Sequence, residues 1–227
     1  MENSSQLPRH LVLLDMDSTF IQQEVIDILA KFAGVGSEVA AITERSMRGD
    51  LDFNASLAER VALLQGLHFS VFEQVRAEIS LSKGAQEIVS TLHERGDVIA
   101  IISGGFDNII APILQNVGVD YFRANTLEVH EGVLTGKTIG PVINREAKAT
   151  YLIELANRFS IPLSHTVAVG DGANDLGMME KAGLSIAFNA KPVVQEAAIE
   201  QINSGDLFEI IGIMEQHYKI YKNNIKI

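Results

Sequence analysis

The chain has 227 residues, of which 47% are hydrophobic and 21% charged, and it contains no cysteine. This composition is that of a globular protein with a sizeable core, and it excludes wholesale disorder, disulfides and cysteine nucleophiles. The net charge of −11 argues against nucleic acid or an anionic membrane as the main partner, since both bind basic surfaces, but it still allows an anionic small-molecule substrate.

The N-terminal residues 1–6 are polar and lack the order of charges and apolar residues that marks a signal peptide. No apolar run approaches the roughly 18 residues that a membrane helix needs. We therefore expect a soluble, cytoplasmic protein. A homodimer is compatible with the sequence, which carries no signal for or against one.

The first predicted strand covers residues 11–15, and the pair Asp15 and Asp17 lies at its end. Side chains two residues apart on a strand point the same way, and two adjacent carboxylates are unfavourable unless a cation or a shared proton relieves them. The alternative is that Asp17 or Ser18 only caps a helix that starts near Thr19.

Residues 24–80 have helical spacing of apolar side chains and no strand alternation. Ser70 and Glu73 have the spacing of a capping box before a further helix. This part of the sequence predicts a small helical domain that is inserted after the first strand.

A second strand is predicted over residues 98–103, and Ser103 and Gly104 lie where it ends. A hydroxyl and glycine N–H groups at the start of a helix can bind an anion, although a glycine turn without a ligand is common. Residues 121–136 alternate around Glu131 and predict a hairpin.

Asn144 is predicted to cap a helix that continues through Leu155, which places Lys148 in or near its first turn. A cation there opposes the helix dipole and is more favourable when an anion lies at that helix end. A solvated lysine is the ordinary expectation, but the position favours a phosphate contact.

A third strand is predicted over residues 166–171, followed by glycines on both sides of Asp171, and a fourth over residues 184–188. Asp171 would be an oxygen ligand suited to Mg²⁺, whereas the alternative is a turn with Asn174 or Asp175 as a helix cap. Three carboxylates in one crevice require a cation, which favours the metal site.

Strands that alternate with helices predict an α/β fold with a Rossmann-like parallel sheet flanked by helices. In such folds ligands bind at the carboxyl ends of the strands, so the polar residues at the strand ends should meet in one crevice.

The motifs resemble those of the haloacid dehalogenase-like phosphatases, most closely the branch that acts on phosphoserine. The resemblance extends over residues 12–202. The general family motifs are residues 15–19, 103–105, Lys148 and 170–175. The stretches that are more specific to the branch are residues 24–27, 42–47, 52–61, 103–106 and 187–192. The resemblance implies a catalytic core of residues 1–23 and 81–227 and a cap domain of residues 24–80 that sets substrate specificity.

The resemblance also implies a role for each site residue. Asp15 would be the nucleophile and Asp17 the general acid and base, with Mg²⁺ held by Asp15, the backbone carbonyl of Asp17, and Asp171. Residues expected to bind the substrate are Ser103, Gly104, Lys148 and Asn174 in the core and Glu24, Met47, Phe53 and Arg60 in the cap, with Asp175 in support.

The activity implied is hydrolysis of O-phospho-L-serine, with Glu24 on the ammonium group and Arg60 on the carboxylate. Two alternatives remain open. One is a phosphatase or phosphotransferase of the same fold that acts on another small phosphomonoester, and the other is a catalytically silent module that binds a phosphorylated ligand. Ile28 departs from the branch, in which an acidic residue is common at that position, and the N-terminal regulatory domain of longer family members is not expected.

Overall fold

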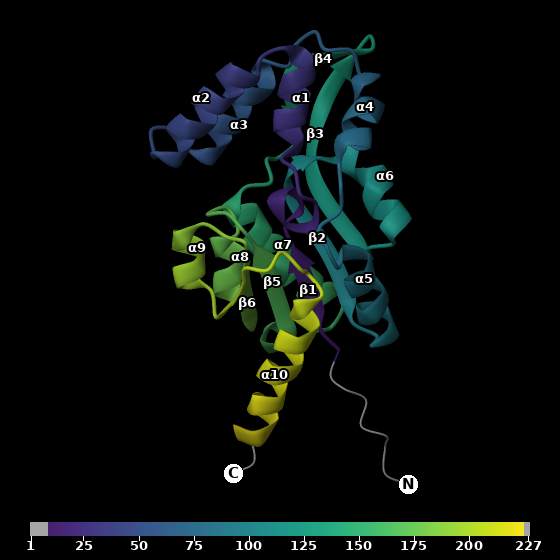
Figure 1. Ribbon diagram of the computed structural model, residues 1–227, viewed down its shortest axis with the longest axis vertical. Coiled ribbons are helices and arrows are strands. Elements are labelled where there is room, and N and C mark those ends of the chain that lie inside the picture. Colours follow the sequence, from purple (N-terminus) through teal and green to yellow (C-terminus); the bar gives the residue numbers. More distant parts are fainter. Residues whose placement is uncertain (1–8, 225–227) are drawn as a thin grey trace.

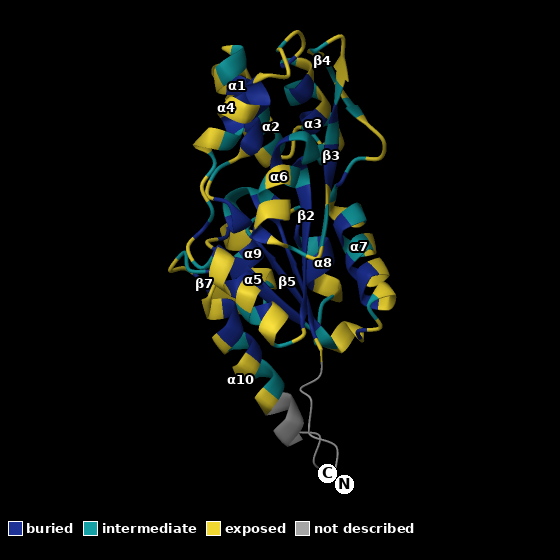
Figure 2. Ribbon diagram, turned by 90° about the vertical axis from the view of Figure 1, so that its right-hand side faces the viewer, coloured by how far each residue is buried: buried dark blue, intermediate teal, exposed yellow. Residues whose placement is uncertain are grey.

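The computed structural model describes residues 9–224, with side chains up to residue 219. Its centre is a seven-stranded sheet in the order β4-β3-β2-β1-β5-β6-β7, and the central strands form the buried interior in Figure 2. All neighbouring strands are parallel except β3 and β4, which form an antiparallel hairpin. The strands are β1 (Leu11–Leu14), β2 (Val98–Phe106), β3 (Tyr121–His130), β4 (Val133–Ile139), β5 (Thr166–Gly170), β6 (Leu184–Phe188) and β7 (Glu200–Ile202).

The predicted strands lie at the middle of this sheet. β2, β1 and β5 are the three central neighbours, β6 follows next to β5, and the predicted hairpin is formed by β3 and β4, so these predictions are confirmed. Every residue of β1 is buried because both faces of the sheet are covered. Such strands appear as continuous aliphatic runs rather than as alternating patterns.

Helices cover both faces of the sheet (Figure 1). One core cluster joins the face of Val12 and Leu14 to the three helices that cover it and continues into the helices after β1, and a second joins the face of Leu11 and Leu13 to three others. The first group is α5 (Ala85–Glu94), α6 (Asp107–Val117) and α10 (Glu209–Asn224), and the second is α7 (Arg145–Arg158), α8 (Leu176–Lys181) and α9 (Pro192–Ala197), with the short η2 (Leu163–His165) before β5. Among the described residues, no helix is both long and apolar enough to cross a membrane.

The segment between β1 and α5 is helical, as predicted, and lies beyond the carboxyl ends of the strands (Figure 1). It consists of the turn η1 (Met16–Phe20) and of α1 (Val25–Ala33), α2 (Gly36–Met47), α3 (Phe53–Ala62) and α4 (Val71–Glu78). The division of the chain into a core and a cap of residues 24–80 stays a prediction. The capping box is wrong: Ser70 has helical dihedral angles, and its hydroxyl pairs with Nδ1 of His68 rather than with a helix N–H.

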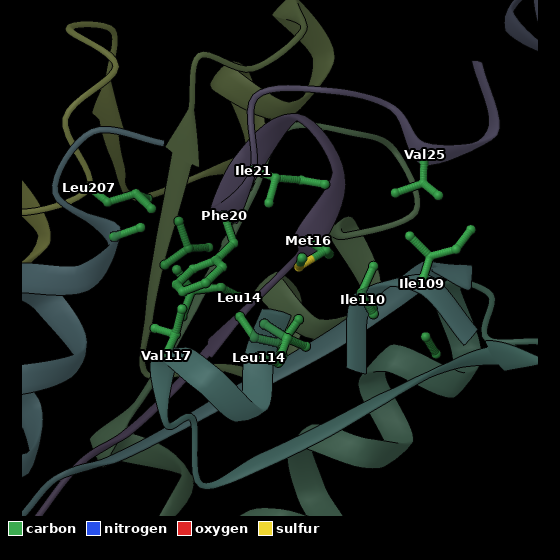
Figure 3. Packing of buried hydrophobic residues seen from close by; sticks show 14 of the residues in the cluster. Leu14, Met16, Phe20, Ile21, Val25, Ile109, Ile110, Leu114, Val117 and Leu207 are labelled. Carbon is green, nitrogen blue, oxygen red and sulfur yellow. The ribbon is translucent and has the colours of Figure 1, made fainter. Parts of the chain in front are cut away.

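The turn η1 is anchored in the core by its apolar residues. Met16 and Phe20 are fully buried and pack in the cluster that includes Leu114 and Val117 of α6 (Figure 3). The polar residue Asp17 between them is left to face the carboxyl ends of the strands. The first motif thus combines an apolar anchor with carboxylates that are held in a fixed place.

The β3–β4 hairpin extends beyond the other strands of the sheet and contacts one side of the helical segment. Three backbone hydrogen bonds join the residues after α3 to β4 and its turn: Gly66 N donates to Leu134 O at 2.8 Å, Leu134 N to Leu67 O at 2.9 Å, and Phe69 N to Gly132 O at 2.9 Å. From this attachment α2 and α3 extend over the carboxyl ends of the strands (Figure 1). They therefore form the roof of whatever binds there.

Candidate active site

A cavity of about 640 Å³ lies at the carboxyl ends of the central strands and beneath α2 and α3. Its floor includes Asp15 and Asp17, which follow β1, Gly104 at the end of β2, and Asp171, which follows β5. These strands are neighbours in the sheet, so the predicted convergence of their polar ends is observed.

Lys148 lies directly below the cavity and is fully buried. Its ammonium group donates to Oδ1 of Asp15 and to Oδ1 of Asp175, each at 2.6 Å. The position follows from the helix, because Asn144 caps α7 through Ala147 N as predicted. The solvated lysine is excluded, and one of the three ammonium donors remains available for a phosphoryl oxygen.

The pKa values of Lys148 and Asp15 are strongly shifted by their surroundings. Burial alone would lower the pKa of Lys148, but the carboxylates of Asp15 and Asp175 outweigh it and raise that pKa above its usual value. Burial raises the pKa of Asp15 well above its usual range, and Asp175 adds to this although Lys148 opposes it. One lysine therefore does not compensate the negative charge gathered here.

Asp175 orients its neighbours rather than facing the cavity. It is fully buried, and while Oδ1 binds Lys148, Oδ2 accepts a hydrogen bond from Gly172 N at 3.1 Å. A Cβ at Gly170 would overlap the Asp175 carboxyl group, so the glycine is needed for this close approach. Both Asp175 oxygens thus accept hydrogen bonds within the protein, and its supporting role stays a prediction.

Asp17 occupies a turn with unusual backbone geometry. The next residue, Ser18, has a positive φ of 55°, and Oδ1 of Asp17 accepts from Val25 N at the start of α1 at 3.2 Å. A Cβ on Gly105 would lie 2.5 Å from Oδ2 of Asp17, so only glycine lets β2 pass this carboxyl group. Burial, followed by the charge of Glu24, raises the pKa of Asp17 to about 8. A carboxyl group that holds its proton near neutral pH is suited to act as a general acid.

The donor set fits a hard divalent cation. Asp15, Asp171 and Asp175 each place a carboxylate oxygen within 4.8 Å of the others, the one group of this kind among the described residues. Burial, with the charges of Asp175 and Glu24, raises the pKa of Asp171 to about 7. Oxygen ligands with an excess of negative charge are what Mg²⁺ prefers in proteins. A divalent metal site is therefore supported.

The predicted anion site lies inside the irregular end of β2 rather than after the strand, which continues to Phe106. Ser103 is fully buried, and its Oγ accepts from Gly105 N at 2.8 Å. Gly104 is held by Asn125, whose Nδ2 donates to Gly104 O at 2.8 Å while its Oδ1 accepts from Ile143 N at 2.9 Å. Asn125 is not among the predicted site residues, although a single amide within a strand next to an expected site was a usable signal.

The predicted substrate residues of the cap lie around the same cavity, namely Glu24, Met47, Phe53 and Arg60. Glu24 accepts from Ser18 Oγ at 2.6 Å, and Arg60 Nε donates to Ser56 O at 3.2 Å. A Cβ at Gly104 would come within 3.0 Å of the Phe53 ring, so the roof reaches the floor there. Met47 is 66% exposed and lies at the open end.

Of the twelve predicted site residues, nine line the cavity, including Asn174, and the other three lie just beneath its surface. Those three are Ser103, Lys148 and Asp175. The structure brings all twelve together. Their individual roles stay predictions.

A pH dependence follows from the carboxyl groups of Asp17 and Asp171. Their native pKa values of about 8 and about 7 exceed the value of an unfolded carboxyl group. Between the unfolded and native pKa values the native state holds more protons than the unfolded state, so stability falls as pH rises. Without a cation, we expect the free energy of unfolding to decrease by on the order of 2 kcal/mol between pH about 5 and about 8. This decrease is smaller than the full pKa shifts imply, because Asp17 partly contacts cavity solvent. Thermal melts in EDTA measure this decrease.

Added Mg²⁺ should raise Tm more at the upper end of this range than at the lower end, because the ligands bind metal when deprotonated. Asp17→Asn should reduce the slope of the metal-free curve. Equal Mg²⁺ stabilisation at both pH limits would contradict binding by these carboxylates.

Residues 12–180 match the haloacid dehalogenase-like hydrolase family, and the chain belongs to that family. The matched residues include all the predicted site residues, from Asp15 to Asp175.

Relatives with known names and solved structures show which group within this family the chain resembles. The phosphoserine phosphatase of Streptococcus thermophilus is 48% identical over 206 residues, which are 91% of this chain and 96% of the relative. A substrate-bound phosphoserine phosphatase complex has a TM-score of 0.87 at 43% identity, and a phospho-aspartyl intermediate analogue of phosphoserine phosphatase has 0.86 at 44%. Each covers 91% of this chain and 99% of the solved one. Within the hydrolase family, the chain therefore belongs to the phosphoserine phosphatases.

Proposed function

We propose that the protein hydrolyses O-phospho-L-serine to L-serine and phosphate in an Mg²⁺-dependent reaction through an aspartyl phosphate, as the last step of serine biosynthesis. The observation that carries this proposal is one cavity with Asp15 on its floor and with Glu24 and Arg60 on its roof. The relatives and the solved intermediate analogue support it.

Asp15 is the proposed nucleophile. Its Oδ1 is bound by Lys148, which leaves Oδ2 to form a bond to phosphorus while the bond from phosphorus to the serine oxygen breaks. The charge of Lys148 also limits the pKa of Asp15, which keeps the carboxylate available. The product of this step is an aspartyl phosphate on Asp15 and free serine.

Asp17 is the proposed general acid and base. Its proton goes to the departing serine oxygen, and the resulting carboxylate then takes a proton from the water that attacks phosphorus and breaks the acyl phosphate bond. The protonated carboxyl group that the first step needs is consistent with the raised pKa of Asp17. Acid–base help of this kind is typically worth ~10²–10⁴-fold.

The phosphoryl oxygens would be held by the third donor of Lys148, the Ser103 hydroxyl and the N–H of Gly104. Asn174, at the edge of the cavity, would reach the substrate. Asp175 would keep Lys148 in place, since it binds the same ammonium group.

Asp15, the Asp17 backbone carbonyl and Asp171 would hold the cation, and Mg²⁺ is our choice because all the donors are oxygens. When bound, it would offset the repulsion between the nucleophile and the phosphate dianion. We further propose a cytoplasmic location and no nucleic-acid or membrane partner, which the net charge of −11 supports.

A phosphate-release panel tests the function. Phosphoserine should be turned over much faster than p-nitrophenyl phosphate, and EDTA should stop both reactions. Comparable rates on the two esters would overturn the substrate assignment. Transfer of phosphate to an added alcohol in preference to water would indicate a phosphotransferase.

Arg60→Lys tests the carboxylate contact. A guanidinium can bind a carboxylate with two parallel hydrogen bonds and an ammonium cannot, so we expect KM for phosphoserine to rise about 10-fold or more with a smaller change in kcat. Kinetics on p-nitrophenyl phosphate, which lacks that carboxylate, should be nearly unchanged. Arg45→Lys is the control, because Arg45 is exposed and pairs with Glu59 outside the cavity. An equal loss on both esters would show that Arg60 acts only on the fold of the cap.

A further inference from the structure

Acidic residues outnumber basic ones around a cavity that must admit a phosphate dianion. Seven acidic residues line it, against three basic ones. The acidic residues are Asp15, Asp17, Glu24, Asp27, Asp52, Glu146 and Asp171, and the basic ones are Arg60, Arg145 and Lys191. Besides the proposed metal ion, a cation on the approach to the phosphate end would help such a cavity to attract a phosphate dianion.

Two of the cations near the substrate already have partners in the proposed function. Lys148 is buried between two carboxylates, and Arg60 lies in the cap at the amino-acid end of the substrate. Arg145 packs its backbone and Cγ over Gly177 of α8, and its charge does not figure among those that act on Asp15, Asp17 or Asp171. Lys191 remains.

Lys191 is tied to the metal side of the cavity by its backbone. Its N–H donates to Asp171 O at 3.1 Å, so the lysine starts beside the predicted metal ligand. Its charge also opposes the rise in the pKa of Asp171, and it does so more strongly than Lys148. The positive charge of Lys191 therefore acts on the phosphate end of the cavity, where Asp171 lies.

The loop around Lys191 is held in place on both sides. Asn189 N donates to Ile202 O at 2.8 Å, Gln195 Nε2 donates to Ala190 O at 2.7 Å, and Pro192 occupies the first turn of α9. The Lys191 side chain is exposed, and its ammonium forms no hydrogen bond or ion pair with residues 9–219. A fixed backbone that carries a free cation is a suitable element for attracting an anion.

We propose that Lys191 is a substrate-binding residue whose ammonium group attracts the phosphate dianion and helps to seat it beside Asp171. This inference rests on the proposed phosphatase function and adds a residue to its phosphate end. The competing explanation is that only the backbone of Lys191 matters, as the cap of α9 and as a tie to Asp171. Replacement of the side chain charge separates the two, because it leaves the backbone contacts in place.

Lys191→Gln is expected to raise KM about 3- to 10-fold at low ionic strength for phosphoserine and equally for p-nitrophenyl phosphate, with the effect on KM rather than on kcat. High salt should reduce the difference, since exposed charges are screened over about 10 Å at 0.1 M and about 3 Å at 1 M. Lys191→Arg should keep KM close to that of the unmodified chain. Lys181→Gln is the matched control, because Lys181 is also exposed and pairs with Glu180 outside the cavity.

Both esters share the phosphate, so the test does not depend on which one is the natural substrate. Equal rates on the two esters would overturn the proposed substrate, while the comparison of Lys191→Gln with the unmodified chain would still stand. Calorimetric titration of inorganic phosphate into the Mg²⁺-containing protein gives the same comparison without turnover, and we expect a Kd that is raised by the same factor. An unchanged KM and Kd in Lys191→Gln, or an increase that salt does not reduce, would overturn the role of Lys191.

Discussion

Replacing Asp15 by Asn is expected to lower turnover of phosphoserine by about 10⁴-fold or more while the protein stays folded. An amide cannot form the acyl phosphate, and water alone would have to attack a phosphate in a site that is built for a carboxylate nucleophile. The loss should fall on kcat, because the proposed phosphate contacts of Ser103, Gly104 and Lys148 remain. Phosphate release in a purified sample, at saturating phosphoserine and Mg²⁺, measures it.

The same substitution should not destabilise the metal-free fold. The Asp15 carboxylate is buried and is repelled by Asp175 and Asp171, and a neutral side chain of the same shape removes both costs while Lys148 keeps its partner Asp175. We expect an unchanged or raised Tm in EDTA. Asp50→Asn is the control for the exchange itself, since Asp50 is exposed and lies outside the cavity. Substantial activity in Asp15→Asn would refute the nucleophile assignment.

The strands of this fold could be predicted because buried parallel strands leave a simple pattern. β1, β2, β5 and β6 are runs of aliphatic and β-branched residues that end in polar or glycine residues, and each was found in the sequence. β7 could not be found, because Glu200–Ile202 is too short to show a period. Ser70 shows the opposite error, in which a local pattern has the right spacing but His68 takes the hydroxyl.

The site was predictable to the extent that strand ends define it. The topology of a parallel sheet brings Asp15, Ser103 and Asp171 together, and this needs no knowledge of side-chain packing. The burial of Lys148 against Asp15 was beyond any local pattern, since 133 positions separate the two residues. Glu24 and Arg60 have the appearance of ordinary surface charges, and only the resemblance to a family singled them out.

Replacing Lys148 by Met is expected to destabilise the protein by about 3–5 kcal/mol and to abolish activity. Methionine fills a similar volume, so the cost is electrostatic: the buried carboxyl groups of Asp15 and Asp175 lose their common cation. Without that cation the pKa of Asp15 lies still further above its unfolded value, so the deficit should grow as pH rises above about 4 and should shrink in acid. Chemical unfolding in EDTA at several pH values measures it. Lys31→Met is the control, because Lys31 is exposed and pairs with Glu78 on the surface.

The double variant Lys148→Met with Asp175→Asn separates structure from chemistry. Removing the charge of Asp175 leaves one buried carboxyl group instead of two, so much of the lost stability should return, because the two sites are coupled rather than additive. Activity should not return, since the donor for the phosphoryl oxygen is still missing and Asp15 still lacks its cation. If activity recovered together with stability, Lys148 would be only a structural counter-charge. If neither recovered, the repulsion between Asp15 and Asp175 would not be what Lys148 relieves, and the cost of the single variant would have to come from packing.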